Sequence, residues 1–415
     1  MSLLHQRLKD EQPEVSEEVM SAEDESGNYN YEQIRNNIRE KLLQLNVPVD
    51  DRDRLEKSIL EMLNNDYPQL SRMQRQDLAG VIAYDIAGYG PIQPLIDDPE
   101  VTDIMVNRFD EIYYERNGTE YKYKGRFYNE KHLRDVIEKI VSRVGRRVDE
   151  SSPIEGARLP DGSRVQIVLP PVAVDGAAVT IRRFRSDVTE DKLIEWGVLT
   201  RSQINLLADF VKARLNLVIS GGTGTGKTTL LNVLSKYIDE RVAAIEDVAE
   251  LTLDVPNMVR FETRPPNIEG KGEISQEALL KSALRKYPKR IIVGECRAGE
   301  AFQMLQAMNT GHPGSLTTAH ANSPEDCIYR IKDMVLMSEQ GSRMNEHSIY
   351  SQIGQALHIV VQLDRLPSGK RVVTRISEIE AKNGAQARDV YLWRKGKLVK
   401  VNEFSEQIHE LVNFS

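Results

Sequence analysis

A run of glycines and threonines between an apolar stretch and an expected helix carries the clearest chemistry in this chain. Gly221 is followed, four residues later, by Gly226-Lys227-Thr228, which is the spacing of a P-loop. Glycines let the backbone fold around a phosphate so that its N–H groups point inward. Lys227 can then reach the β- and γ-phosphates of a nucleotide, and the Thr228 hydroxyl can ligate Mg²⁺. The residues expected at the nucleotide are Gly222, Thr223, Gly224, Thr225, Gly226, Lys227, Thr228 and Thr229.

The alternative for this stretch is a flexible loop that binds nothing. The neighbouring sequence argues against that alternative, because an apolar strand, 217–219, comes directly before the glycines. A helix is expected after them, and its N-terminus would bring positive partial charge to the phosphates. Its apolar residues follow at helical spacing: Leu230, Leu231, Val233, Leu234 and Tyr237.

Carboxylates and a histidine follow further apolar stretches, where parallel strands would end. Glu246, Asp247 and Glu250 come after residues 242–245, Glu295 after 291–293, and His320 after 315–318. Ligands of such sheets bind beyond the carboxyl ends of the strands, so these side chains are predicted to converge on one nucleotide. Hydrolysis of a γ-phosphate needs Mg²⁺, a carboxylate that orients or deprotonates water, and donors for the developing charge. The pattern therefore predicts ATP and Mg²⁺ as cofactors of a hydrolytic site.

Glu295 stands where a Walker B carboxylate is expected, but the usual Asp one position earlier is Gly294. Action of Glu295 through a metal-bound water is then more natural than direct Asp ligation, since Mg²⁺ usually keeps several waters. Structural alternatives remain for each residue alone. Glu295 could begin a helix, Glu250 could be a surface residue, and His320 could be a hydrogen-bonded structural histidine.

Five arginines gather ahead of the P-loop in an otherwise acidic chain: Arg158, Arg164, Arg182, Arg183 and Arg185. One interpretation is a solvated, ion-paired sheet edge that resists aggregation. The other is a set of arginines aimed at the triphosphate across a domain cleft. Spacing alone favours the first interpretation.

Composition bounds the class of protein. The chain has 415 residues, enough for two or three domains, and a net charge of −8 that argues against bulk binding to nucleic acid. We find no apolar run of 18 residues and no basic-then-apolar leader, so we expect a cytoplasmic protein with no integral membrane segment. The cysteines, Cys296 and Cys327, cannot supply a four-cysteine zinc site.

Changes in pattern along the chain predict five segments. Residues 1–29 are a disordered acidic tail, 30–87 a three-helix bundle, 88–185 a mixed α/β domain, 186–199 a linker, and 200–415 the ATPase domain. Strands that alternate with helices after the P-loop favour a mostly parallel sheet covered on both faces. The predicted fold class is therefore α/β, with a RecA-like P-loop ATPase domain preceded by a mixed α/β domain and an N-terminal three-helix bundle.

Four blocks together resemble one family. Residues 221–229, 245–250, 292–297 and 311–320 resemble the Walker A, Asp box, Walker B and His box of the type II/type IV secretion ATPase superfamily. Gly294 belongs to that family's pattern, so the departure noted above supports the resemblance. The resemblance covers about residues 31–380.

Two further stretches, 157–165 and 180–184, look closest to the CpaF type, the ATPase of Flp/Tad pilus machines. Pilus-extension and type II secretion ATPases of the superfamily commonly carry a four-cysteine zinc insertion. This chain cannot carry one, which favours the CpaF-like or type IV secretion branches.

The resemblance also implies a role for each matching residue. Lys227 and Thr228 would bind phosphate and Mg²⁺, and Glu250 would be the general base or would position water. Glu295 would hold the Mg²⁺ shell by binding the metal through water, and His320 would sense the γ-phosphate. Arg164 and Arg183 would reach the nucleotide from the preceding domain.

The resemblance implies a homohexamer under an inner-membrane pilus platform protein, at the cytoplasmic face of that membrane. Such a ring would power assembly, with or without retraction, of a Tad/Flp-type pilus. The alternative is a type IV secretion ATPase that moves protein or DNA substrates. A third hypothesis is a nucleic-acid motor, which the acidic net charge makes less favourable. Another form of this hypothesis is a nucleotide-gated scaffold that does not hydrolyse ATP.

Overall fold

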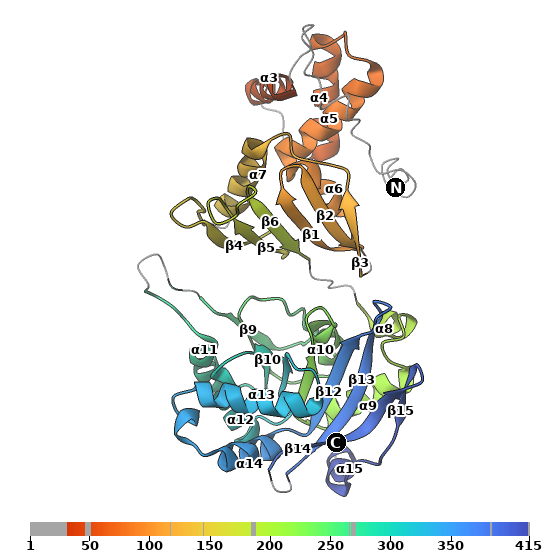
Figure 1. The fold of residues 1–415 in the computed structure, drawn as a ribbon, viewed down its shortest axis with the longest axis vertical. Helices are drawn as coiled ribbons and strands as arrows, with labels where there is room; N and C mark the ends of the chain where they lie inside the picture. The colour runs from red at the N-terminus through yellow and green to blue at the C-terminus, as the bar shows by residue number, and fades with distance from the viewer. Residues whose placement is uncertain are drawn as a thin grey trace. The chain divides into compact units, whose positions relative to one another are not determined.

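The computed structural model describes residues 31–45, 51–116, 118–143, 145–183, 188–264, 266, 271–381 and 384–413. The acidic tail predicted over residues 1–29 lies outside these ranges. The chain divides into two compact units, one that ends at Phe184 and one that begins at Arg185. Figure 1 shows the elements of both units.

In the part of the first unit that the structure describes, the chain begins with three helices, where the sequence predicts a bundle. They are α3 (Tyr31–Gln44), α4 (Arg52–Asp66) and α5 (Arg72–Ala87). Asp51 caps α4, and Ser71 with Gln74 forms a capping box at the start of α5, so both starts are encoded locally. The apolar stripes form one core, which includes Ile38, Leu55, Ile59, Leu63 and Ile82.

An antiparallel sheet of six strands completes the first unit, in the order β3-β2-β1-β6-β5-β4. Its strands are β1 (Val101–Arg108), β2 (Glu111–Arg116), β3 (Thr119–Tyr123), β4 (Ile154–Arg158), β5 (Arg164–Val168) and β6 (Ala178–Arg182). Helix α7 (Glu130–Arg143) packs its apolar face into the same core as the sheet, and η1 (Gly90–Ile92) and α6 (Gln93–Asp97) precede β1. The β2–β3 hairpin predicted from its Asn-Gly turn is confirmed, since Arg116 pairs with Thr119.

A buried ionic cluster joins α3 and α5 to α7, which packs on the sheet. The Asp85 carboxylate of α5 lies 3.2 Å from Nε of Arg35 in α3 and 3.0 Å from Nε2 of His132 in α7. Lys139 of α7 donates hydrogen bonds to the carbonyls of Ile86, at 2.8 Å, and Gly88, at 2.6 Å. Because buried charges are costly unless paired, these contacts hold the helices and the sheet layer as one unit.

The second unit is built on a nine-stranded sheet in the order β15-β14-β13-β12-β7-β11-β10-β8-β9. The strands from β12 to β9 in that order are parallel, and β12 to β15 pair antiparallel. Its strands are β7 (Leu217–Gly221), β8 (Val242–Glu246), β9 (Met258–Glu262), β10 (Arg290–Cys296), β11 (Leu316–Ala319), β12 (Ile359–Arg365), β13 (Arg371–Glu380), β14 (Gln386–Arg394) and β15 (Lys397–Lys400).

Helices cover both faces of this sheet (Figure 1). Leu217 and Ile219 of β7 face a core shared with α9 (Arg201–Lys212), α10 (Lys227–Ser235) and α15 (Glu406–Asn413). Val218 points to the opposite core, which is shared with α11 (Gln276–Ala283), α12 (Glu300–Asn309), α13 (Pro324–Met337) and α14 (Glu346–Ala356). Short helical turns follow α11 and α13: η2 (Leu284–Lys286) and η3 (Gly341–Arg343). The predicted α/β fold class is confirmed.

The stretch predicted as a linker contains structure of its own. Helix α8 (Glu190–Glu195) lies in it, and Leu193, Val198 and Leu199 enter the core of the second unit. The second unit therefore begins to pack before Thr200, where the sequence pattern predicts the start of the ATPase domain. Within the described ranges, no helix is both long and apolar enough to cross a membrane.

Candidate nucleotide site

The predicted P-loop connects β7 to α10 in the middle of the parallel sheet. Thr225 donates a hydrogen bond from Oγ1 to the carbonyl of Gly222, at 3.0 Å, which closes the loop on itself. Gly226 precedes α10 with a φ of +98°, a left-handed conformation that glycine adopts without strain. Among the described residues no side chain caps this helix start, so its geometry suits an anion at the first turn. Thr228 and Thr229 lie in that first turn.

Gly221 is required by the strand beside it. A Cβ atom at this position would lie 2.3 Å from the carbonyl oxygen of Leu363 and 2.8 Å from Oγ1 of Thr225. Leu363 is the register partner of Gly221 on β12, so the conflict is with backbone that cannot move aside. The first glycine of the motif thus allows β12 to pair up to the edge of the loop.

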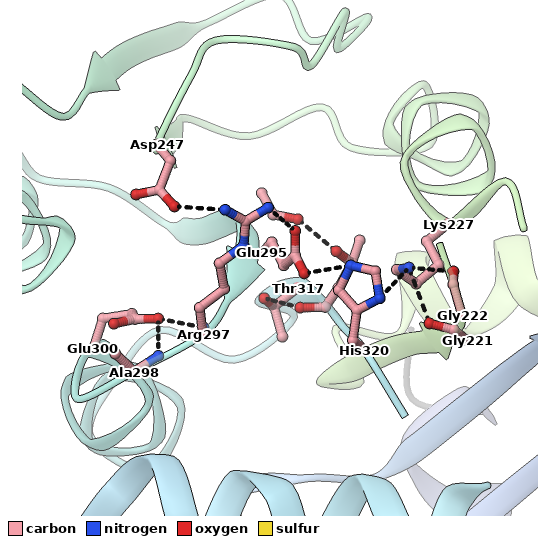
Figure 2. A network of polar contacts seen from close by, with 12 residues as sticks. Gly221, Gly222, Lys227, Asp247, Glu295, Arg297, Ala298, Glu300, Thr317 and His320 are labelled. Atoms are coloured by element: carbon pink, nitrogen blue, oxygen red, sulfur yellow. Dashed lines mark hydrogen bonds and ion pairs between the residues drawn. The ribbon is translucent and has the colours of Figure 1, made fainter. Parts of the chain in front are cut away.

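Lys227 is buried and points back into the loop (Figure 2). Its Nζ donates hydrogen bonds to the carbonyls of Gly221, at 3.0 Å, and Gly222, at 2.8 Å, and lies 3.5 Å from Nδ1 of His320. Burial lowers the pKa of Lys227 to about 8, although the charge of Glu295 acts in the opposite direction. The ammonium is therefore poised to gain from an anionic ligand that would restore its usual pKa.

His320 bridges Lys227 and Glu295. Its Nε2 lies 2.8 Å from Oε1 of Glu295, while Nδ1 faces the lysine (Figure 2). Burial, followed by the charge of Lys227, lowers the pKa of His320, so the ring is neutral at pH 7. The arrangement favours the tautomer with its proton on Nε2, because Nδ1 can then accept from the ammonium. The predicted convergence of Lys227, Glu295 and His320 is observed.

Arg297 is a member of the site that sequence reasoning missed. Its Nη2 donates to Oε2 of Glu295 at 2.7 Å, and its Nη1 donates to Oδ2 of Asp247 at 3.4 Å (Figure 2). One signal was available, since residues two apart at a strand end point to the same side and 295 and 297 are so spaced. The guanidinium links the carboxylates at the ends of β10 and β8.

Glu250 lies in the irregular segment between β8 and β9, beyond the carboxyl end of β8. Its backbone N–H donates a 2.7 Å hydrogen bond to Oε1 of Glu246, the last residue of β8. Glu295 belongs to the next strand of the sheet, β10, so both carboxylates belong to the same edge. Arg371, at the start of β13, contacts the P-loop itself: its Nε donates a hydrogen bond to the carbonyl of Gly224, at 2.7 Å.

Four of the five arginines in the predicted cluster lie in the first unit, and Arg185 lies outside the described residues. Arg158, Arg164 and Arg182 are cross-strand neighbours on β4, β5 and β6. Arg183 is held within its own unit, where Nη1 donates to the carbonyls of Asp98 and Val101, the latter at 3.3 Å. Contact of Arg164 or Arg183 with a phosphate stays a prediction.

The side chains at the carboxyl edge of the second unit's sheet can serve phosphoryl transfer. The P-loop and Lys227 offer donors to phosphate oxygens, and the hydroxyl of Thr228 with the carboxylate of Glu295 offers the hard oxygen ligands that Mg²⁺ prefers. These ligands would suit a Mg²⁺ ion that keeps several waters and also binds phosphate oxygens. Glu250 adds a carboxylate that can act on water.

The chain is similar to proteins of bacterial secretion and conjugal transfer. Residues 85–413 match the family described as "Type II/IV secretion system protein". The conjugal transfer protein TrbB of Rhizobium radiobacter is 34% identical over 284 residues, which are 67% of this chain and 83% of that protein. The type IV secretion system protein VirB11 of Brucella suis is 33% identical over 301 residues, 66% of this chain and 82% of that protein.

A relative from Mycobacterium tuberculosis, provisionally named a conjugal transfer protein, is 30% identical over 342 residues. That alignment covers 80% of this chain and 95% of the relative. The crystal structure of the Yersinia pseudotuberculosis ATPase DotB is similar in fold, with a TM-score of 0.50 and 19% identity. The likeness covers 70% of this chain and 78% of that one.

Proposed function

Because the chain belongs to the Type II/IV secretion system protein family, we propose that it is a Mg²⁺-dependent ATPase that couples ATP hydrolysis to mechanical work. The observation that carries this proposal is the contact chain from Lys227 through His320 to Glu295. In this chain of contacts, His320 touches both Lys227 of the P-loop and Glu295, the Walker B carboxylate. Family membership and this geometry support hydrolysis over passive nucleotide binding.

In the proposed reaction each side chain has a distinct task. The P-loop amides and Lys227 hold the β- and γ-phosphates, while Thr228 and Glu295 would hold Mg²⁺, which would neutralise charge on the phosphates. Glu250 orients or deprotonates the attacking water. Neutral His320 detects the γ-phosphate through Lys227. A phosphate that draws the Lys227 ammonium away from Nδ1 removes one contact of the imidazole ring.

We propose a homohexamer that acts at the cytoplasmic face of the inner membrane through a membrane-embedded platform protein. The first candidate cargo is the pilin of a Tad/Flp-type pilus, and the motifs at 157–165 and 180–184 favour it. The second candidate is the substrate of a type IV secretion system. The names of the TrbB and VirB11 relatives favour this second cargo.

The enzymatic part is tested with the purified full chain. Steady-state ATP turnover is measured with Mg²⁺, with EDTA, and in Lys227→Ala, and the mass of the particle is measured by light scattering with and without ATP. We expect a hexamer whose turnover falls about a hundredfold or more in Lys227→Ala and without Mg²⁺. Lys281→Ala, at an exposed ion pair on α11, is the matched control and should keep full turnover.

Turnover that survives Lys227→Ala, or a protein that remains monomeric at micromolar concentration with ATP, would contradict the proposal. Deletion of the gene separates the cargoes, since loss of surface pili supports the first and loss of substrate transfer with intact pili supports the second. Stimulation of turnover by nucleic acid would instead favour a nucleic-acid motor.

A further inference from the structure

Glu246 is a buried carboxylate at the end of β8, with 3% of its surface exposed. Its Oε1 accepts hydrogen bonds from the backbone N–H groups of Glu250 and Leu251, each at 2.7 Å. One oxygen thus holds two consecutive amides of the segment that carries Glu250. That segment has neither helix nor strand of its own, so side-chain contacts must define its path.

Arg260 of β9 holds the same segment from the other side. Its Nη2 donates to the carbonyl of Leu251 at 2.8 Å and lies 3.5 Å from Oε2 of Glu246. Both backbone polar groups of Leu251 are therefore engaged. Burial raises the pKa of Glu246, and the two amides and the guanidinium act in the opposite direction.

Gly294 provides the space that the Glu246 side chain occupies. Ile245 and Val293 are register partners on β8 and β10, so residues 246 and 294 follow them side by side. A Cβ atom at residue 294 would lie 3.0 Å from Cγ and 3.5 Å from Oε1 of Glu246. A larger residue at 294, such as the Asp of the usual Walker B pattern, would press on Cγ of Glu246 and require that side chain to shift.

We propose that Glu246 is a positioning residue that fixes Glu250 over the reacting phosphate, and that Gly294 is a glycine because Glu246 needs its space. This inference rests on the proposed function, in which Glu250 acts on the attacking water. Glu246 itself touches backbone and Arg260 in the structure, and it acts on the reaction through the placement of Glu250. The glycine at residue 294, which departs from the Walker B pattern, then leaves room for the buried carboxylate of Glu246.

The test combines Glu246→Ala, Glu246→Gln and Gly294→Ala in the full chain, with ATP turnover measured over a range of ATP concentrations. Glu246→Ala should lower kcat by about tenfold to a hundredfold, because the general base is displaced, and change KM by less than about threefold. Glu246→Gln keeps an oxygen acceptor and should recover most of kcat. Glu339→Ala removes a carboxylate from an exposed ion pair with Arg343 elsewhere in the same unit, and it should keep kcat.

Gly294→Ala should lower kcat by about threefold to tenfold in the wild-type background and have little effect in Glu246→Ala, since the crowded side chain is gone. Equal losses from Gly294→Ala in both backgrounds would overturn the proposed link between the two positions. An unchanged kcat in Glu246→Ala, or a loss in Glu246→Gln as large as in Glu246→Ala, would overturn the positioning role.

Amide hydrogen exchange followed by mass spectrometry tests whether Glu246 holds the segment that carries Glu250, and it requires no ATP turnover. Peptides that contain Glu250 and Leu251 should exchange about tenfold faster in Glu246→Ala and at the wild-type rate in Glu246→Gln. Unchanged exchange in Glu246→Ala would overturn the inference. If the wild-type protein shows no turnover that depends on Lys227, the proposed function fails, while the exchange result still decides whether Glu246 holds this segment.

Discussion

Lys227 is the residue on which the candidate site depends most directly. Its ammonium is held by two carbonyls of its own loop, Gly221 and Gly222, and faces His320. Buried ammonium groups lose their proton more readily than exposed ones, and a bound triphosphate would oppose that loss. Protonation of Lys227 and binding of nucleotide are therefore coupled.

This coupling predicts the sign of a pH effect. With a pKa of about 8 in the free protein, Lys227 is largely neutral at pH 9, and a bound phosphate must restore its proton. Binding of a nonhydrolysable ATP analogue should therefore take up a proton near pH 8.5, and affinity should fall up to about tenfold for each pH unit above 8. Titration calorimetry in buffers of different ionisation enthalpy measures that uptake.

Lys139 supplies the control for this measurement. Burial also lowers its pKa to about 8, but it lies in the first unit and donates to backbone carbonyls. Lys139→Arg should bind the analogue with the same proton uptake as the wild-type protein. Binding without proton uptake in the wild-type chain would contradict the assignment to Lys227.

The junction of β7, the P-loop and β12 is the element whose backbone geometry is most constrained. Gly221→Ala would place a methyl group against the carbonyl of Leu363, so we expect the second unit to lose about 1–3 kcal/mol of stability. Both tryptophans, Trp196 and Trp393, lie in that unit. Urea unfolding followed by tryptophan fluorescence therefore reports on it selectively.

Gly222→Ala is the matched control for that substitution. A Cβ atom there would lie 3.8 Å from Cγ2 of Thr225, an ordinary contact, so the unfolding free energy should change by no more than about 0.5 kcal/mol. Equal stability of the two variants would show that β12 relaxes around the added methyl group.

For the molecule as a whole, the question is whether the first unit takes part in catalysis. Arg164 lies on β5 between Arg158 and Arg182, and its role at phosphate stays a prediction. Arg164→Ala should weaken ATP binding or turnover by roughly tenfold to a hundredfold, the value of one charge-assisted hydrogen bond, and leave the fold intact. Turnover kinetics together with circular dichroism measure both effects.

Arg182→Ala is the control for Arg164→Ala. Arg182 is the cross-strand partner of Arg164, but its Nε pairs with Asp103 at 2.9 Å and its side chain is 54% exposed. It should behave as a surface ion pair and keep normal kinetics. Unchanged kinetics in Arg164→Ala as well would leave the cluster as a solvated sheet edge. Arg183→Ala is a poorer probe, because Arg183 also holds the carbonyls of Asp98 and Val101.

Features that depend on residues close together in the chain could be predicted from the sequence. The P-loop was predictable because its glycines, Lys227 and Thr228 act within eight consecutive residues. The β2–β3 hairpin was predictable for the same reason, since an Asn-Gly turn carries its own backbone preference. Alternation of apolar runs with helices was enough for the α/β class and for placing Glu295 and His320 at strand ends.

Which of these strand ends are neighbours could not be predicted from local patterns. Lys227 meets His320 across 93 residues because β11 lies beside β7, and Glu246 lies beside Gly294 because β8 pairs with β10. Strand order and register arise from the packing of the whole sheet against its two helical layers, and local patterns do not encode them. Three features follow from that packing: the hydrogen bonds from the Glu250 segment to Glu246, the contact of Arg297 with Glu295, and the need for glycine at residue 294.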